Sequence, residues 1–181
     1  MPSLSDWGDS MSREFEPSAR AAALRILSVK PYTMVELRKK LLRKGYHSSD
    51  IETVLKEFVA NGYLNDREYA ERFAENKRLH SFHGKRMIAF QLKAKGLPQE
   101  IIDDAVTSDH SEEDEYQLAS DAAEKKLQQW RAFGKKKDLK QLRMKLFSFL
   151  QRRGFPNRIV HGVIKAHIPY ESSEDDFFDT D

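Results

Sequence analysis

The segment Leu41-Leu42-Arg43-Lys44-Gly45-Tyr46 has two counterparts later in the chain, Leu92-Lys93-Ala94-Lys95-Gly96-Leu97 and Leu150-Gln151-Arg152-Arg153-Gly154-Phe155. Each segment has a leucine four residues before its glycine, a basic residue directly before it and a bulky apolar residue directly after it. Apolar residues also recur eight residues before each glycine and six and ten residues after it: Leu37, Ile51 and Leu55; Ile88, Ile102 and Val106; Leu146, Val160 and Ile164. Agreement at so many offsets predicts three tandem structural repeats.

The apolar residues around each glycine follow helical spacing, and no stretch shows the sustained apolar–polar alternation of a strand. A glycine can end a helix by adopting the left-handed backbone conformation. Gly45, Gly96 and Gly154 are therefore predicted to close the second helix of each repeat. The sequence predicts an all-α protein with three helices in each of three repeats.

Several helix starts can be predicted from local signals. The patterns Thr33-x-x-Glu36 and Ser49-x-x-Glu52 are capping boxes, in which two side chains satisfy unpaired amides at the start of a helix. Pro98 and Pro156 lie two residues after their glycines and are predicted to be the first residues of helices, where a missing amide costs nothing.

Composition shifts and helix signals divide the 181-residue chain into five segments. They are an acidic disordered tail (1–16), repeat 1 (17–62), repeat 2 (63–107), repeat 3 with a long first helix (108–170) and an acidic C-terminal tail (171–181). A unit of about 50 residues is too small to be strongly stable alone, so neighbouring repeats are expected to stack into an elongated, curved array.

The net charge of +2 conceals large blocks of opposite sign. Residues 125–170 hold 13 basic residues and one acidic residue, whereas residues 107–124 and 171–181 hold seven and six acids with no Lys or Arg. One acid among 13 bases leaves the positive field largely uncompensated. This pattern favours an acidic or polyanionic partner.

Basic residues recur along the second helix of each repeat and before its glycine. Cations near a helix C-terminus also stabilise the helix itself, which explains part of this pattern but not its extension back along the helix. Repetition would line one side of the array with cations suited to a long, regular polyanion. The predicted binding residues are Arg38, Lys39, Arg43, Lys44, Lys85, Arg86, Lys93, Lys95, Lys135, Lys136, Lys137, Lys140, Arg143, Arg152 and Arg153. Phe73, Phe90, Phe147 and Phe149 have core-like spacing and are predicted to be buried.

The sequence carries none of the common catalytic signatures. It has no Gly-rich phosphate loop, no G-x-S-x-G and no H-E-x-x-H, and the absence of cysteine excludes thiol chemistry and Cys-ligated metals. His80-x-x-His83 lacks a suitably spaced third ligand, so no metal site is predicted. We therefore expect a non-enzymatic protein without a cofactor.

An ordered set of motifs resembles the RecX family, the regulators of bacterial RecA recombinase. The motifs are Ala22-Ala23-Leu24-Arg25-Ile26-Leu27, residues 32–41, Lys44-Gly45-Tyr46, residues 62–70, Gly84-Lys85-Arg86-Met87 and residues 92–97. The resemblance covers about 150 residues and is looser in the third repeat, which has a long first helix and a Lys-rich turn. The acidic extensions at both ends are departures from the family pattern.

The resemblance implies three tandem three-helix repeats that bind the RecA–DNA filament in its groove as a monomer. It implies that the protein limits filament growth, ATPase activity and strand exchange, in DNA repair, recombination and the SOS response. A different reading of the same cations is a helical-repeat module that binds single- or double-stranded nucleic acid directly. Without a signal peptide or an apolar run of membrane-spanning length, the chain is expected to be cytoplasmic.

Overall fold

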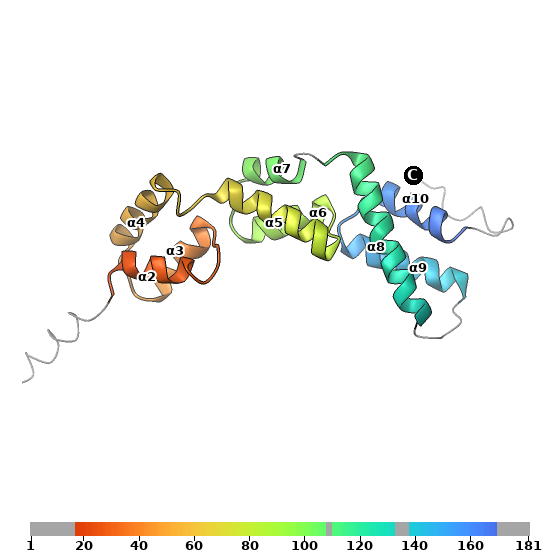
Figure 1. Cartoon of the computed structure of the whole chain (residues 1–181), viewed down its shortest axis with the longest axis horizontal. Helices are drawn as coiled ribbons and strands as arrows, with labels where there is room; N and C mark the ends of the chain where they lie inside the picture. The colour runs from red at the N-terminus through yellow and green to blue at the C-terminus, as the bar shows by residue number, and fades with distance from the viewer. Residues whose placement is uncertain (1–16, 108–109, 133–137, 170–181) are drawn as a thin grey trace, which may run out of the picture. The chain divides into compact units, whose positions relative to one another are not determined.

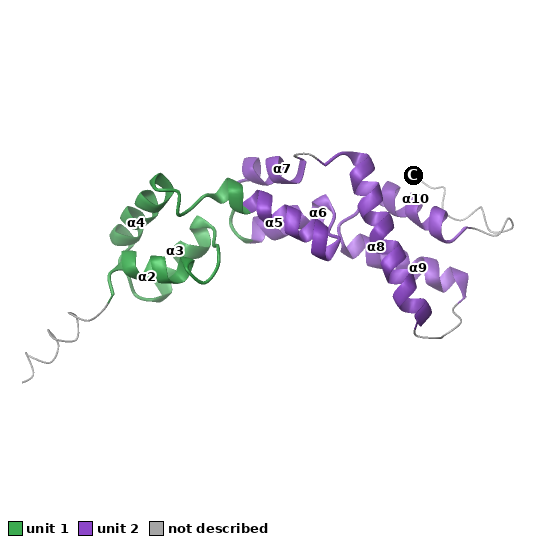
Figure 2. Ribbon diagram, viewed as in Figure 1, with its two compact units in different colours: residues 1–69, 95–97 green, residues 70–94, 98–181 purple. Residues whose placement is uncertain are grey.

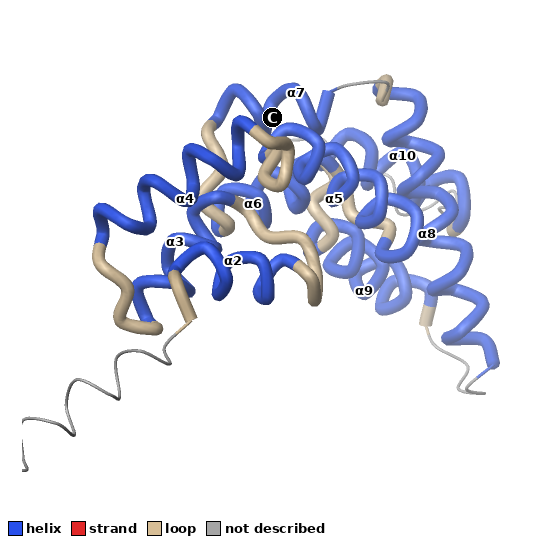
Figure 3. The backbone as a smooth tube through the Cα atoms, turned by 60° about the vertical axis from the view of Figure 1, so that its left-hand side comes forward, coloured by secondary structure: helices blue, strands red, loops and turns tan. Residues whose placement is uncertain are grey.

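The computed structural model describes residues 17–107, 110–132 and 138–169. All the secondary structure in these segments is α-helical (Figures 1 and 3), which confirms the predicted fold class. The helices are α2 (Ala19–Leu27), α3 (Met34–Arg43), α4 (Ser48–Ala60), α5 (Asp66–Ser81), α6 (Lys85–Ala94), α7 (Gln99–Thr107), α8 (Glu112–Ala132), α9 (Leu139–Arg152) and α10 (Asn157–His167). No helix in the described segments has both the length and the apolar composition needed to span a membrane.

The contacts group the helices into two compact units (Figure 2). Unit 1 comprises the described residues up to 69 together with 95–97, and unit 2 comprises 70–94 and the described residues from 98 onward. Unit 1 therefore contains α2, α3 and α4, and it also holds the short turn that follows α6.

The core of unit 1 is formed by one apolar face of each of its three helices. Leu37 and Leu41 of α3 lie one turn apart and are fully buried, as are Ile51 and Phe58 of α4. The small side chains of α2, such as Ala23, complete the cluster. This i, i+4 placement is the helical periodicity read from the sequence.

The predicted capping box at the start of α3 is confirmed. Thr33 Oγ1 accepts a hydrogen bond from the Glu36 amide, and a Glu36 carboxylate oxygen accepts one from the Thr33 amide, both at 3.2 Å. Thr33 is completely buried, and its hydroxyl also donates to the Lys95 carbonyl oxygen at 2.9 Å. The cap thus ties α3 to a segment more than 60 residues later in the chain.

The second predicted capping box is wrong. Helix α4 begins at Ser48 with His47 as its N-cap, which makes no side-chain hydrogen bond, so Ser49 lies inside the helix. The carboxylate of Glu52 instead pairs with Arg38 of α3 at 2.6 Å. The Glu52 carboxylate, which the local pattern assigned to capping α4, thus forms an ion pair with another helix.

Pro98 and Pro156 each lie one position before the first residue of their helix, rather than at that residue as predicted. Pro156 is the N-cap of α10, with an extended backbone (φ −63°, ψ 149°), and its carbonyl oxygen accepts a hydrogen bond from the Val160 amide at 3.0 Å. The Pro98 carbonyl oxygen accepts from the Ile102 amide at 3.1 Å in the same way. Each proline therefore supplies the first helical acceptor rather than the first helical residue.

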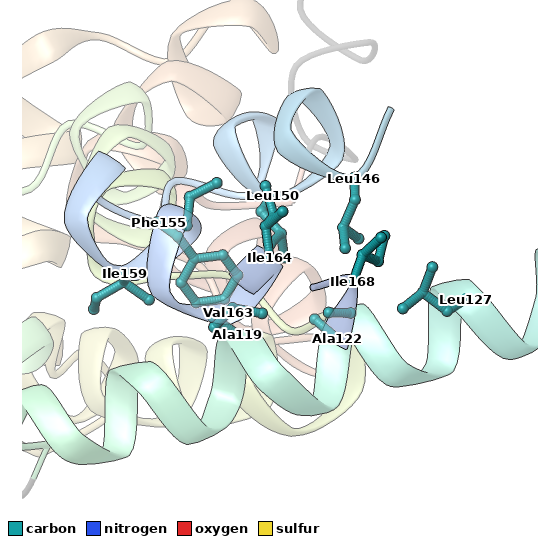
Figure 4. Close-up of a cluster of buried hydrophobic side chains, with 12 residues drawn as sticks. Ala119, Ala122, Leu127, Leu146, Leu150, Phe155, Ile159, Val163, Ile164 and Ile168 are labelled. Carbon is teal, nitrogen blue, oxygen red and sulfur yellow. The ribbon is translucent and has the colours of Figure 1, made fainter. Parts of the chain in front are cut away.

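The largest apolar cluster lies in unit 2 between α8, α9 and α10 (Figure 4). Helix α8 contributes mainly alanines, which allow α10 to pack closely against it. Larger side chains fill the remaining space. The cluster consists of Ala119, Ala122, Ala123, Leu127, Leu146, Leu150, Phe155, Ile159, Val160, Val163, Ile164 and Ile168.

The three repeated glycines have the predicted left-handed conformation, with φ of +88° at Gly45, +83° at Gly96 and +88° at Gly154. Their surroundings differ. A Cβ at Gly154 would collide with the backbone nitrogen of Met87, and one at Gly96 would lie 2.7 Å from a methyl group of Val35, whereas space beside Gly45 is open.

The prediction that four phenylalanines are buried holds only in part. Phe147 and Phe149 are partly buried against the core of unit 2, and Phe73 is also partly buried. Phe90 is 69% exposed, so its assignment to the core is wrong. It lies on the opposite side of α6 from Ile88 and Leu92, which are fully buried.

Candidate functional site

Helix α3 presents most of the basic residues predicted for unit 1. Lys39, Arg43 and Lys44 are exposed and form no ion pair with a described acid. Arg38 differs, because it pairs with Glu52 and both side chains are 44% exposed. Such a surface pair contributes at most about 1 kcal/mol and leaves Arg38 accessible to a competing anion.

Two lysines that were not among the predicted binding residues lie near the ring of one tyrosine of unit 1. The Nζ atoms of Lys30 and Lys40 each lie 4.9 Å from the centre of the Tyr32 ring. An aromatic face attracts cations through its quadrupole, so this ring holds two positive charges close together. Sequence spacing alone does not reveal the pair, because Lys30 lies in the turn before Tyr32.

Lys95 has a structural role within unit 1. Its Nζ donates to Glu36 Oε1 at 2.9 Å and lies 5.4 Å from the centre of the Tyr69 ring. Burial opposes the charged amine, but interactions with Tyr69 and Glu36 outweigh it and raise the pKa of Lys95. This charge is therefore already balanced inside the unit.

In unit 2, two of the predicted binding residues anchor the fold. Lys85 Nζ donates to the His110 carbonyl oxygen at 2.6 Å. Arg143 is only 8% exposed and donates from Nη2 to the Pro169 carbonyl oxygen at 2.7 Å. Arg143 is therefore buried rather than presented to solvent as expected, and Lys85 is partly buried, because each donates to a backbone carbonyl of a distant segment.

The other predicted residues of unit 2 remain on the surface. Arg86, Lys93, Lys140 and Arg152 are exposed and form no ion pair with a described acid. Lys135, Lys136 and Lys137 lie outside the described residues.

Arg153 is partly buried against an aromatic ring. Its guanidinium lies 4.7 Å from the centre of the Phe149 ring, and burial lowers its pKa. Lys126 of α8, which the sequence analysis did not single out, lies 5.5 Å from the centre of the same ring. Phe149 therefore brings together cations from α8 and from the end of α9.

A buried polar cluster joins α6 to the start of α8 within unit 2. Glu115 is 3% exposed, and its Oε1 accepts a hydrogen bond from the Lys85 amide at 2.9 Å. Burial raises the pKa of Glu115, although Lys85, Arg78 and Arg86 oppose the rise. Gly84 allows the close approach, because a Cβ there would lie 2.7 Å from Glu115 Oε1.

His110 completes this cluster. Its Nε2 lies 3.2 Å from Glu115 Oε2, yet neither atom makes a hydrogen bond. Burial lowers the pKa of His110, and the nearby cations Arg78 and Lys85 lower it further. The protonated imidazole is therefore disfavoured, and the cluster has the character of a structural junction.

Of the two histidines considered for metal binding, His83 lies among cations. Burial lowers the pKa of His83, and Arg153 and Lys77 reinforce this effect. Cations beside an imidazole disfavour a metal cation there. Across the described segments, no three His, Asp or Glu residues are grouped as metal ligands.

Three family models match the chain in order along its length. They describe the first, second and third three-helix domains of RecX, and they match residues 19–58, 65–106 and 112–164. The chain belongs to the RecX family. The matched ranges fall on α2–α4, α5–α7 and α8–α10, so each three-helix repeat corresponds to one RecX domain.

Similar proteins support this assignment. The regulatory protein RecX of Vibrio campbellii is 36% identical over 138 residues, which is 76% of this chain and 84% of the relative. The regulatory protein RecX of Chlorobaculum tepidum is 32% identical over 162 residues, or 90% and 96% of the two chains. The RecX crystal structure from Lactobacillus salivarius has the same fold, with a TM-score of 0.70 at 23% identity over 88% of this chain and 97% of that one.

Proposed function

We propose that this RecX-family chain is a non-catalytic modulator of RecA recombinase, and mainly an inhibitor. It binds the RecA–DNA filament in its groove and limits filament growth, ATP hydrolysis and strand exchange. In this proposal it acts as a cytoplasmic monomer without a cofactor, in DNA repair, recombination and the SOS response. The observation that carries the proposal is the ordered match of all three RecX domains.

The exposed cations support a polyanionic or acidic partner. Lys39, Arg43 and Lys44 on unit 1 have no acidic partner among the described residues, and Arg86 and Lys93 on unit 2 have none either. Uncompensated charge of one sign raises the local concentration of an oppositely charged partner and speeds association.

The decisive experiment is RecA-catalysed ATP hydrolysis on single-stranded DNA with increasing amounts of the full chain. We expect a dose-dependent decrease in the hydrolysis rate at a fixed DNA concentration. Unchanged hydrolysis, with a filament pull-down showing no bound chain, would contradict the proposal.

A matched pair of variants tests the contribution of α3. Arg43→Gln with Lys44→Gln should raise the concentration needed for half-maximal inhibition several-fold, because two uncompensated cations are lost. Arg25→Gln with Lys56→Gln removes the same charge from other exposed positions of unit 1 and should have a smaller effect. Equal effects would mean that net charge acts rather than this surface.

Direct binding to nucleic acid is the second candidate function. It is favoured by the cations of α8 and α9 that lack acidic partners, such as Lys126 and Arg153. Release of counterions from a single strand gives a slope of about −0.7 per phosphate contact in a plot of log affinity against log salt. A slope near −4, for about six contacts, would favour direct binding, whereas contacts with RecA should depend less steeply on salt.

A further inference from the structure

The end of α8 and the end of α9 form a surface in which one aromatic ring lies near two cations. Lys126 Nζ lies 5.5 Å from the centre of the Phe149 ring and 5.7 Å from that of Trp130. The Arg153 guanidinium lies 4.7 Å from the centre of the Phe149 ring. Lys126 belongs to α8 and Arg153 to the end of α9, and both cations lie near the Phe149 ring.

Two more cations belong to this neighbourhood. Lys125, next to Lys126, lies with its Nζ 5.1 Å from the centre of the Phe82 ring. The amide of His83, the residue after Phe82, donates to the Lys77 carbonyl oxygen at 3.1 Å, and the Lys77 Nζ lies 5.2 Å from the centre of the Phe73 ring. We name Lys77, Lys125, Lys126 and Arg153, with the rings of Phe82 and Phe149, the α8–α9 basic surface.

The cations of this surface are not paired with acids in the part of the chain that the structure describes. None of its four cations forms an ion pair with a described Asp or Glu, and Lys126 donates only to the neutral side-chain oxygen of Gln129. Elsewhere in unit 2, Arg158 pairs with Glu112. The α8–α9 basic surface is thus one where positive charge is concentrated and left unneutralised.

Stability alone does not explain this arrangement. A cation over an aromatic ring and a cation at a helix C-terminus each stabilise a fold slightly. Four cations in one neighbourhood also repel one another, and a purely structural surface would relieve this repulsion with an acid. The arrangement is better explained by a ligand that supplies several negative charges.

The mixture of cations and rings indicates the class of ligand. A single-stranded nucleic acid offers phosphates to the cations and flat bases to aromatic and guanidinium groups. A run of Asp and Glu offers charge but no planar rings, and a duplex keeps its bases stacked inside. We propose that the α8–α9 basic surface is a binding site for single-stranded nucleic acid, used by the chain without RecA. The site depends on the proposed function only for its biological setting.

The test is direct binding of the full chain to a fluorescent oligothymidine of about 20 nucleotides, followed by anisotropy without RecA. Lys126→Gln with Arg153→Gln should weaken binding about tenfold and make the salt slope less steep by about 1.4, the value for two lost phosphate contacts. The control Arg25→Gln with Lys165→Gln also removes one Arg and one Lys, from exposed positions outside this surface and outside the predicted binding residues, and should weaken binding less than about threefold.

The ring is tested separately with Phe149→Leu, which keeps an apolar side chain against the core. We expect several-fold weaker binding to the oligonucleotide, with a cooperative thermal transition retained. A Phe149→Tyr variant keeps a ring at this position and should bind like the unmodified chain.

If the unmodified chain binds the oligonucleotide, three further outcomes would overturn the site. They are equal losses in the two double variants, tighter binding to a duplex of the same length than to the single strand, and displacement of the strand by a poly-glutamate peptide at equal charge concentration. Inhibition of RecA ATP hydrolysis is measured in parallel. If the unmodified chain inhibits RecA but fails to bind the oligonucleotide, the site is refuted and the proposed function stands.

Discussion

The Lys85 amide donates a hydrogen bond to Glu115 Oε1 at 2.9 Å, although the two residues are 30 positions apart. The carboxylate therefore caps the N-terminus of α6 from the first turn of α8. Gly84 permits the approach, and its own amide donates to the Arg153 carbonyl oxygen at 2.8 Å. The start of α6 is thus bonded both to α8 and to the segment that ends α9.

Loss of the Glu115 carboxylate should destabilise unit 2. Glu115→Ala leaves the Lys85 amide without its partner, and an unsatisfied buried group costs about 1–3 kcal/mol in the free energy of unfolding. Urea denaturation followed by circular dichroism measures the change. Glu113→Ala, an exposed position in the same first turn, is the control and should change stability by less than about 0.5 kcal/mol. Equal stability of the two variants would contradict the capping role.

Stability should fall on mild acidification because of His110. Burial lowers the pKa of His110 from its ordinary value of 6.5, and Arg78 and Lys85 lower it further. Below about pH 6.5 the unfolded chain therefore takes up a proton that the folded chain resists, so stability is full above this pH and decreases below it. Unfolding should accordingly be easier at about pH 5.5 than at about pH 7.5.

A variant isolates this effect from neighbouring groups. His83, whose pKa is also lowered, contributes in the same direction, whereas the raised pKa of Glu115 favours the folded state on acidification. Asp114, whose pKa is lowered mainly by Ser111, loses its contribution only in more acidic solution. His110→Gln should reduce the difference in unfolding free energy between the two pH values, while His47→Gln, at an exposed position of unit 1, should preserve it. An unaltered pH dependence in His110→Gln would refute the assignment.

The three repeated glycines should differ in their sensitivity to substitution. Gly45→Ala introduces only the left-handed strain, about 1–2 kcal/mol. Gly154→Ala should cost more, because its Cβ also meets the Met87 backbone, and valine should be worse at either position. Melting temperatures should therefore decrease in the order unmodified, Gly45→Ala, Gly154→Ala. Unaffected unfolding combined with lost filament binding would instead mean that the glycine is functional.

Charge reversal of Lys135, Lys136 and Lys137 should weaken binding to the filament and to DNA. These residues belong to the most basic block of the sequence and lie outside the described structure, between α8 and α9 in the chain. Substitution of all three by Glu should leave the helical circular dichroism spectrum unchanged. Unaltered binding of a folded variant at physiological salt would remove them from the interface.

Truncation after Tyr170 should tighten binding, most visibly at low salt. The removed segment, residues 171–181, holds six acids and no base and follows the most basic block. A tethered acidic segment competes at a high effective concentration, and screening by salt weakens that competition. Equal affinities of the full and truncated chains at both low and moderate salt would show that the tail does not compete.

The sequence by itself determined the features that depend on local sterics and local hydrogen bonding. Apolar spacing predicted the helices and the three repeats, and the need for a left-handed residue identified Gly45, Gly96 and Gly154. The Thr33 capping box is equally local, since its partner is three residues away. A basic surface was predictable too, because block charge is a property of composition.

Only the tertiary structure decided which charges remain available, because burial and pairing depend on distant segments. Glu52 pairs with Arg38 instead of forming its predicted cap, and Arg143 is buried and donates to the Pro169 carbonyl oxygen. Lys126 and Arg153 meet at Phe149 because α8 and α9 pack together, and their separation by 27 positions hides this proximity in the sequence. The periodicity of a helix indicates which face is apolar, but the neighbouring helix determines which charge is neutralised and which is exposed to a ligand.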